Sequence, residues 1–348
     1  MMEGGRRLSP PIHIARGKDM FKYICKRLLI SIIILFGVSI IIYFIIRMMP
    51  ADYIDQHTSA QVAQGQLTKE DVQRMKELYG IGDSSFSGIM KSYGQWLSKA
   101  VRGDFGVSFV YGRPVQEVIQ KYMWISFAIS LVAMILNILI SIPLGIVAAT
   151  KQYGAVDYTV TVLAMTGISL PSFFFGALLL RVFSIQLGWF PLQGLSDATK
   201  ILTGPQQVLD IIHHMVLPMV TLVVLSIGGL MRYTRTNMLE VLNSDYIRTA
   251  RAKGLSEKVV IYKHAFRNTL IPIVTMLGGS IPGLFGGAMI TETVFAIPGI
   301  GSTSYKAMLQ GDIPFVMGYM MFLAVLTVLG TILADVSYAI VDPRVKLQ

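Results

Sequence analysis

Charge-free apolar stretches alternate with polar segments along the whole chain. A helix needs about 20 apolar residues to cross ~30 Å of hydrocarbon. Five stretches meet this length. The sixth, Met215–Met231, is shorter but is extended by the neutral residues His213, His214, Tyr233 and Thr234 on its flanks. The pattern predicts six membrane-spanning helices, over Leu28–Ile46, Trp124–Ala149, Tyr158–Leu180, Met215–Met231, Asn268–Thr291 and Ile313–Ala334.

The first stretch follows basic residues, as the apolar part of a signal peptide does. Its length and the poor cleavage sequence at Met48–Asp52 indicate an uncleaved span instead. The polar segments then divide the chain into five parts. These are a cytoplasmic extension at 1–19, a first transmembrane helix at 20–49, an extracytoplasmic loop at 50–123, a five-helix core at 124–341 with a cytoplasmic loop at 235–268, and a cytoplasmic tail at 342–348.

The loop at 50–123 has the composition of a soluble segment. Thr68 is placed to cap a helix with an acidic first turn, and Gly80 is placed to end it. We expect a partly helical cap that packs on the membrane face through its aromatic residues, which are Trp96, Phe105, Phe109 and Tyr111.

Composition excludes the soluble classes. Of the 348 residues 53% are hydrophobic and 14% are charged, against about 25% charged in soluble domains. The mean hydropathy is +0.59, which leaves too little polar surface for a soluble globule. The single cysteine, Cys25, excludes a small disulfide scaffold.

The distribution of Lys and Arg predicts the orientation in the membrane. When the long loop at 50–123 is set aside because long segments cross regardless of charge, the two richest clusters lie before the first span and between the fourth and fifth spans, on the same side. The short segments of the other side hold only Lys200 and Lys306. Positive residues concentrate in cytoplasmic loops, so both termini are predicted to be cytoplasmic. The net charge of +10 then reflects membrane topology, and nucleic acid is not an expected partner.

The cytoplasmic loop between spans four and five predicts a helical elbow. Ser244 or Asp245 could cap a short helix, Gly254 could end it in the left-handed conformation, and Ser256 could cap a second helix that enters span five. The short helix carries basic side chains and small residues that allow close approach. These are Arg248, Arg251, Lys253, Ala250 and Ala252. An ordinary basic loop attracted to anionic lipid is the alternative.

Several motifs, in order, resemble one family of membrane proteins. The elbow sequence Asp245–Leu255 with His264 and Arg267-Asn268 is similar to the signature loop of permease subunits of ABC-type peptide importers. The first, B-type permease of oligopeptide and dipeptide systems is the most similar. Further matching motifs are Gly103–Ser108, Arg113–Val115, Gly167–Phe173, Gly188–Pro191, Glu292–Gly301 and Asp342–Arg344.

This resemblance implies a fold, a function and partners. The fold would be the all-α, six-helix type I ABC importer permease fold in a bacterial cell membrane. The partners would be a homologous second permease, two ATP-binding subunits and an extracytoplasmic peptide-binding protein. The elbow would dock on an ATPase through Asp245, Tyr246, Arg248, Thr249, Ala250, Arg251, Lys253 and Gly254. Relatives in the family also move nickel complexes and glutathione, so the cargo stays open.

The chain lacks a Gly-rich loop for nucleotide phosphates and a sequence motif for metal binding. We therefore expect no cofactor in this chain, no enzymatic activity, and ATP-Mg bound by partner subunits. An intramembrane enzyme would need a catalytic dyad within the spans. An ion-coupled carrier would need intramembrane carboxylates, for which Asp335 alone gives little support.

Prolines and glycines interrupt the later spans. Pro171 and Pro282 are predicted to kink helices along the translocation pathway. Gly279, Gly283 and Gly287 recur every four residues, which predicts one smooth helix face, either at the interface between two permeases or within the bundle. Glu292 is a candidate for an outer gate. Arg181 and Asp335 lie near opposite ends of their spans, so we expect them not to pair.

Overall fold

The computed structural model describes residues 17–47, 59, 62–65, 68–78 and 86–341. The expectations for residues 1–16, for Gly80 and for the tail at 342–348 lie outside these ranges. Helices α1 Gly17–Arg47, α3 Lys69–Leu78, α4 Phe86–Ala100, α5 Val115–Thr150, α6 Ala155–Ser169 and α7 Ser172–Leu179 come first, and a π-helical turn, Leu180–Gln186, follows α7. Then come α8 Pro205–Leu242, α9 Asp245–Ala252, α10 Glu257–Val259, a π-helical turn Val260–Phe266, α11 Arg267–Ser280, a 3-10 helix Pro282–Gly286, α12 Met289–Val294, α13 Ile300–Leu309 and α14 Ile313–Val341.

Five of the predicted spans are long apolar helical segments, and the third is broken. It consists of α6 and a second part, Ser172–Gln186, that bend by 100° relative to each other. The kink predicted at Pro171 is therefore a sharp break, and six spans result only when this bent pair counts as one. The cause is Pro171, because a residue before proline is driven out of the helical region. Leu170 accordingly has an extended backbone.

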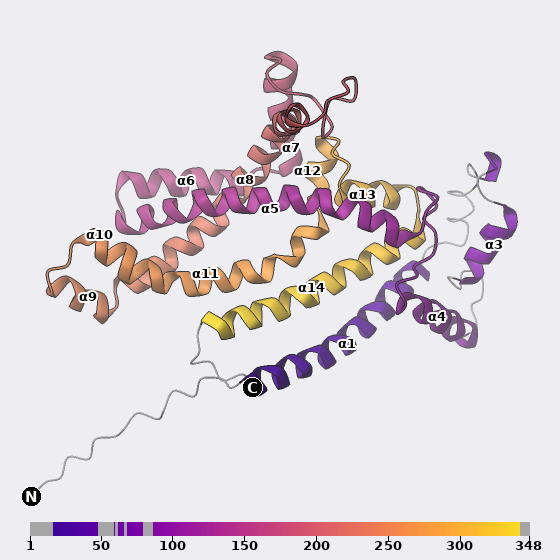
Figure 1. The fold of residues 1–348 in the computed structure, drawn as a ribbon, viewed down its shortest axis with the longest axis horizontal. Coiled ribbons are helices and arrows are strands. Elements are labelled where there is room, and N and C mark those ends of the chain that lie inside the picture. Colours follow the sequence, from indigo (N-terminus) through magenta and orange to yellow (C-terminus); the bar gives the residue numbers. More distant parts are fainter. Residues whose placement is uncertain (1–16, 48–58, 60–61, 66–67, 79–85, 342–348) are drawn as a thin grey trace, which may run out of the picture.

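The long helices form a layered bundle in which α5, α11, α14 and α1 follow one another and α7 turns away from the common axis (Figure 1). α8 packs on both α5 and α6, while α14 packs on α11 and α1. Glycines allow close contact between α6 and α8. A methyl group at Gly167 would lie 2.6 Å from Val224 O, and one at Gly228 would lie 2.5 Å from Ala164 O. The two backbones touch there.

The loop between α1 and α5 packs on the bundle as its aromatic residues predict. Trp96 and Tyr93 of α4 pack on Tyr43 of α1, with the two tyrosine ring centroids 5.3 Å apart. Ser39 and Tyr93 share a 2.8 Å hydrogen bond. Tyr111 packs on Phe315 of α14, and burial raises its phenol pKa to about 12. The expected contact of this loop with the membrane helices is confirmed.

Two polar clusters order the loop locally. The Thr68 hydroxyl accepts the N–H of Asp71, and the Asp71 carboxylate accepts the N–H of Thr68, so the predicted cap at Thr68 is confirmed. These bonds lower the pKa of Asp71. Ser108 and the N–H of Val110 donate to the buried Asp312 carboxyl, which also accepts the N–H of Phe315 at the start of α14. Asp312 thus ties the loop to the last span, and burial raises its pKa.

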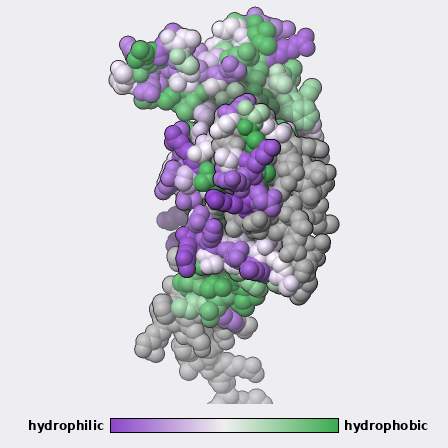
Figure 2. Space-filling view, turned by 90° about the vertical axis from the view of Figure 1, so that its right-hand side faces the viewer, coloured by the Kyte–Doolittle hydropathy of each residue, from purple (hydrophilic) through white to green (hydrophobic). Residues whose placement is uncertain are grey.

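Figure 2 looks onto the end of the bundle that carries α4 and α13. In the coloured part of this face hydrophilic residues dominate the middle and hydrophobic residues gather below it, whereas the top is mixed. The opposite end carries α9 and α10 (Figure 1). The fold therefore separates a loop-covered end from an end that carries the helical elbow.

Candidate coupling site and translocation pathway

The elbow has the predicted helix–glycine–helix geometry. α9 ends at Ala252, the N–H of Gly254 donates to Arg251 O at 2.9 Å, and the backbone of Gly254 is left-handed with φ +76°. Only glycine adopts this conformation cheaply. The chain then reverses into α10. A salt bridge between Arg251 Nε and Glu257 Oε1, at 2.9 Å, joins the two arms of the elbow.

The two serines precede their helices as predicted, but neither caps its helix through its side chain. The Ser244 hydroxyl donates instead to Val241 O, at 2.6 Å, at the end of α8. That part of the prediction is wrong, because the hydroxyl is already committed to the preceding helix. Tyr246 of α9 is also hydrogen-bonded to α11, since its hydroxyl accepts a hydrogen bond from Asn268 Nδ2 at 3.0 Å.

α9 has one buried face and one exposed face. Ile247 is 0% exposed and Ala250 is 7% exposed. Both pack in an inner core built from the ends of several spans, with Ile146, Ala149, Leu230, Met238, Val260, Ala265 and Ile273. Ala250, one of the eight residues expected to dock on an ATPase, therefore faces this chain's own core. The other seven are exposed: Asp245, Tyr246, Arg248, Thr249, Arg251, Lys253 and Gly254.

The three spaced glycines do not form one helix face. α11 ends at Ser280, and Gly287 lies in a left-handed turn with φ +82° after the 3-10 helix. Gly279 packs within the chain, where an added methyl would lie 3.0 Å from Ala334 Cβ of α14. Gly283 has open space beside it. The prediction of a continuous glycine face is wrong, because the helix is interrupted before Pro282.

The two helix breaks lie beside a common hollow. It measures about 460 Å³ and is lined by Ser172 after the first break, by Ala288, Met289, Ile290 and Thr291 after the second, and by Leu222, Leu225 and Ser226 of α8. Non-helical backbone at membrane depth is tolerated only where it is buried in protein or lines a water-filled space. Of the predicted pathway residues at the breaks, Pro171 is exposed and Pro282 is buried, whereas Gly283 lines a separate hollow between α11 and α14.

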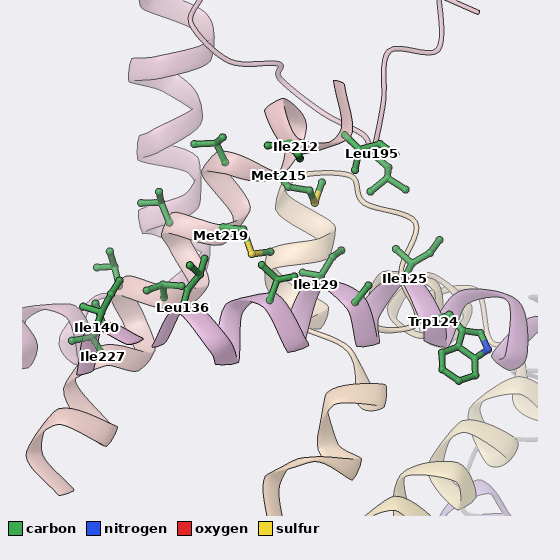
Figure 3. Close-up of a pocket in the computed structure, with 17 residues that line it drawn as sticks. Trp124, Ile125, Ile129, Leu136, Ile140, Leu195, Ile212, Met215, Met219 and Ile227 are labelled. Atoms are coloured by element: carbon green, nitrogen blue, oxygen red, sulfur yellow. The ribbon is translucent and has the colours of Figure 1, made fainter. Parts of the chain in front are cut away.

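A larger groove lies on the other side of α8 (Figure 3). It measures about 890 Å³ and runs between α5 and α8, from Trp124 and Leu195 at one end to Ile140 and Ile227 at the other. Its lining side chains are apolar along the whole length, Met215 and Met219 included. Such a surface suits contact with lipid chains or with another apolar helix and offers no group for polar recognition.

Glu292 is an internal anchor of the outer segment. The residue is 1% exposed. Its Oε1 accepts hydrogen bonds from the Ser126 hydroxyl at 2.6 Å and from the N–H of Ala288 at 2.9 Å, and its Oε2 accepts the N–H of Ser302 at 2.9 Å. Ser126 in turn accepts the N–H of Ile300. The carboxyl thereby joins α5, α12 and α13, a network that the sequence reading did not anticipate.

Two ionic contacts between spans were also missed. Asp335 of α14 lies 3.1 Å from Arg27 Nε of α1. The expectation that it does not pair with Arg181 is consistent with this, and Arg181 is exposed. Asp157 of α6 and Arg235 of α8 form a bidentate ion pair, in which each carboxylate oxygen accepts one hydrogen bond from the guanidinium. Neither pair could be predicted from the sequence, because the two residues of each pair lie on different helices that are far apart along the chain.

No group of three or more potential metal ligands occurs among the described histidines, cysteines and acidic residues. His213 Nε2 lies instead 2.9 Å from Trp189 O, and His214 Nδ1 lies 2.8 Å from Asp210 O. The adjacent histidines are thus engaged with backbone carbonyls.

Sequence comparison decides the family. The model of the family described as "Binding-protein-dependent transport system inner membrane component" matches residues 141–347. The chain belongs to this family. It is also 40% identical over 328 residues to the "Oligopeptide transport system permease protein AppB" of Bacillus subtilis, with 94% of this chain and 100% of that protein covered.

Other similar proteins agree with this assignment. A "Putative peptide permease protein" of Brucella suis is 34% identical over 329 residues, with 94% and 100% of the two chains covered. A crystal structure of the MetNI methionine ABC transporter in inward-facing conformations covers 66% of this chain and 98% of its own, at 18% identity and a TM-score of 0.49; the assignment does not depend on it. Family membership confirms the predicted fold class: an all-α, multi-pass permease of the ABC importer type.

Proposed function

We propose that this permease forms the translocation pathway of an ATP-driven peptide importer, together with a second permease, two ATPase subunits and an extracytoplasmic binding protein. The observation that carries the proposal is the elbow, which combines a helix seated in the inner core with a polar, exposed opposite face. Relatives named as oligopeptide and peptide permeases favour peptide as the cargo. Nickel chelates or glutathione carried by the same machinery are the alternative cargoes.

The elbow is built to transmit force. An ATPase that binds the exposed face of α9 would push Ile247 and Ala250 against the inner core, where residues of α5, α8 and α11 meet. Close-packed interiors transmit displacement because they contain little free volume. Closure of the ATPases would thus rock the spans and change which side of the membrane has access to the pathway.

The hollow beside the helix breaks is the part of this chain best suited to line the pathway. Its hydroxyl groups, from Ser172, Ser226 and Thr291, and its irregular backbone provide weak polar contacts without a fixed charge. Peptides of differing sequence share only their backbone, so a path of this kind would tolerate many of them. Specificity would then rest with the external binding protein.

Copurification tests this function. When the chain is coexpressed with ATPase and permease genes of its own operon, a tagged form should retain both partners in detergent. Substitution of exposed elbow residues, for example Arg248→Glu with Lys253→Glu, should release the ATPase and retain the second permease. The charge-preserving Arg248→Lys is the control. An active transporter obtained from this chain alone would contradict the proposal.

The orientation can be tested with single cysteines in a Cys25→Ser background. Val101, which is 79% exposed in the outer loop, and Lys258 in the elbow provide the two positions. A membrane-impermeant maleimide added to intact cells should label Val101→Cys at once and Lys258→Cys only after permeabilisation. The reverse pattern would contradict the predicted cytoplasmic elbow and termini.

A further inference from the structure

A partly buried ion pair joins the first half of the broken span to the helix that leads into the elbow. Arg235 Nε lies 2.7 Å from Asp157 Oδ1, and its Nη2 lies 2.7 Å from Oδ2. Asp157 is 3% exposed. Two parallel hydrogen bonds of this kind fix orientation as well as distance. The contact thus sets both the separation and the register of α6 against α8.

The remaining hydrogen-bonding capacity of Asp157 is used by the turn that begins α6. Its Oδ2 also accepts the N–H of Tyr153 at 3.0 Å, and its Oδ1 lies 3.4 Å from the Thr161 hydroxyl. Tyr153 has a left-handed backbone, φ 59°, which costs a non-glycine residue about 1–2 kcal/mol. The carboxylate therefore stabilises a strained connection between α5 and α6 and holds it against α8.

Farther along the same interface the two helices touch backbone to backbone. Gly167 lies against Val224 O and Gly228 lies against Ala164 O. Glycine contacts permit close approach but do not by themselves prevent packed helices from sliding, which is a common mode of small conformational change. The ion pair at the inner end supplies the restraint that the glycines lack.

α8 continues from this ion pair directly to the elbow. Arg235 lies within α8, which ends at Leu242, and α9 begins at Asp245. Met238, one turn beyond Arg235, is 0% exposed and packs in the inner core that also holds Ile247 and Ala250 of α9. Motion imposed on α9 thus reaches Arg235 through the close-packed side chains around Met238 and along the last turns of α8.

We propose that Asp157 and Arg235 are positioning residues for coupling: their ion pair makes α6 follow α8, so that displacement of the elbow moves the break at Pro171 and the hollow beside it. This rests on the proposed function, because it concerns how ATP hydrolysis on partner subunits reaches the pathway. Without the pair, α8 would still respond to the elbow, but α6 could slip at the glycine contacts.

The test measures peptide uptake and ATP hydrolysis on the same proteoliposomes, which contain this chain with its second permease, the ATPases and the binding protein. The variants are Asp157→Asn, Arg235→Gln and the double variant, with Arg232→Gln as control because Arg232 is a neighbouring, exposed arginine. Each single variant should lower the number of peptides imported per ATP by about tenfold, within the range of measured coupling free energies, while hydrolysis continues. The double variant should lose no more than either single one, as expected for residues that act as a unit.

Arg235→Lys keeps the positive charge but cannot form two parallel hydrogen bonds to Asp157. It therefore tests the role of the ion pair even if Asp157→Asn and Arg235→Gln fail to assemble. It should assemble and still import fewer peptides per ATP than wild type. An unchanged ratio in Arg235→Lys, additive losses in the double variant, or uptake and hydrolysis that fall in proportion would each overturn the inference. Wild-type proteoliposomes without ATP-dependent uptake would instead reject the proposed function itself.

Discussion

Glu292→Ala is expected to destabilise the permease strongly. The change leaves three donors without their acceptor: the buried Ser126 hydroxyl and the partly buried N–H groups of Ala288 and Ser302. An unpaired buried donor costs about 1–3 kcal/mol, so the loss should be at least ~1 kcal/mol from Ser126 and larger for the three donors together. The fraction of protein that remains monodisperse after heating in detergent measures the effect.

Matched variants separate this network from a general effect of removing a carboxyl. Glu292→Gln keeps the volume and one acceptor oxygen, so its loss should be smaller. Glu240→Ala removes an exposed carboxyl from α8 and should change stability little, as most exposed substitutions do. Equal heat resistance of Glu292→Ala and Glu240→Ala would show that the carboxyl does not hold the outer segment together.

Gly254→Val is expected to have the largest effect on transport. The left-handed conformation costs a residue with a side chain about 1–2 kcal/mol, and β-branched residues are genuine outliers there. A methyl group at Gly254 would meet no atom within 4 Å, so the effect should come from backbone strain alone. The elbow would change its angle, and peptide uptake and stimulated ATP hydrolysis should both fall while membrane insertion persists.

Gly254→Asn is the control, because asparagine tolerates the left-handed region and adds a side chain of similar size. It should retain most of the uptake. Equal uptake by the Val and Asn variants would mean that the backbone conformation at Gly254 does not matter for coupling.

The elbow and most spans could be predicted because their signals are local. A run of apolar residues specifies a spanning helix without reference to the rest of the chain, and a glycine after Ala252 marks the end of α9 by its own conformational freedom. Aromatic residues in an otherwise polar loop, such as Trp96, likewise indicated where that loop meets the bundle.

The errors arose where a periodic pattern was extended across a break. The spacing of Gly279, Gly283 and Gly287 suggests one face only if the helix continues, and it ends at Ser280. The kink at Pro171 was predicted but its size was not, since a proline within an apolar run can either kink a helix mildly or separate two helices. The sequence contains no measure of that angle.

The missed polar contacts depend on tertiary structure. Asp157 and Arg235 are separated by 78 residues, and Ser126 and Glu292 by 166. An acidic residue at the start of a span, such as Asp157, needs a partner once it is buried. The partner of Asp157 is Arg235 of the neighbouring helix α8.

The most direct test of the account is uptake of a labelled peptide by proteoliposomes that contain this permease, its second permease, the ATPases and the binding protein. Uptake should require ATP and every component, and it should be unaffected when the proton and sodium gradients are collapsed. Uptake by this chain in the absence of the ATPases, driven by an ion gradient, would contradict the claim that the chain is a permease subunit of an ATP-driven peptide importer.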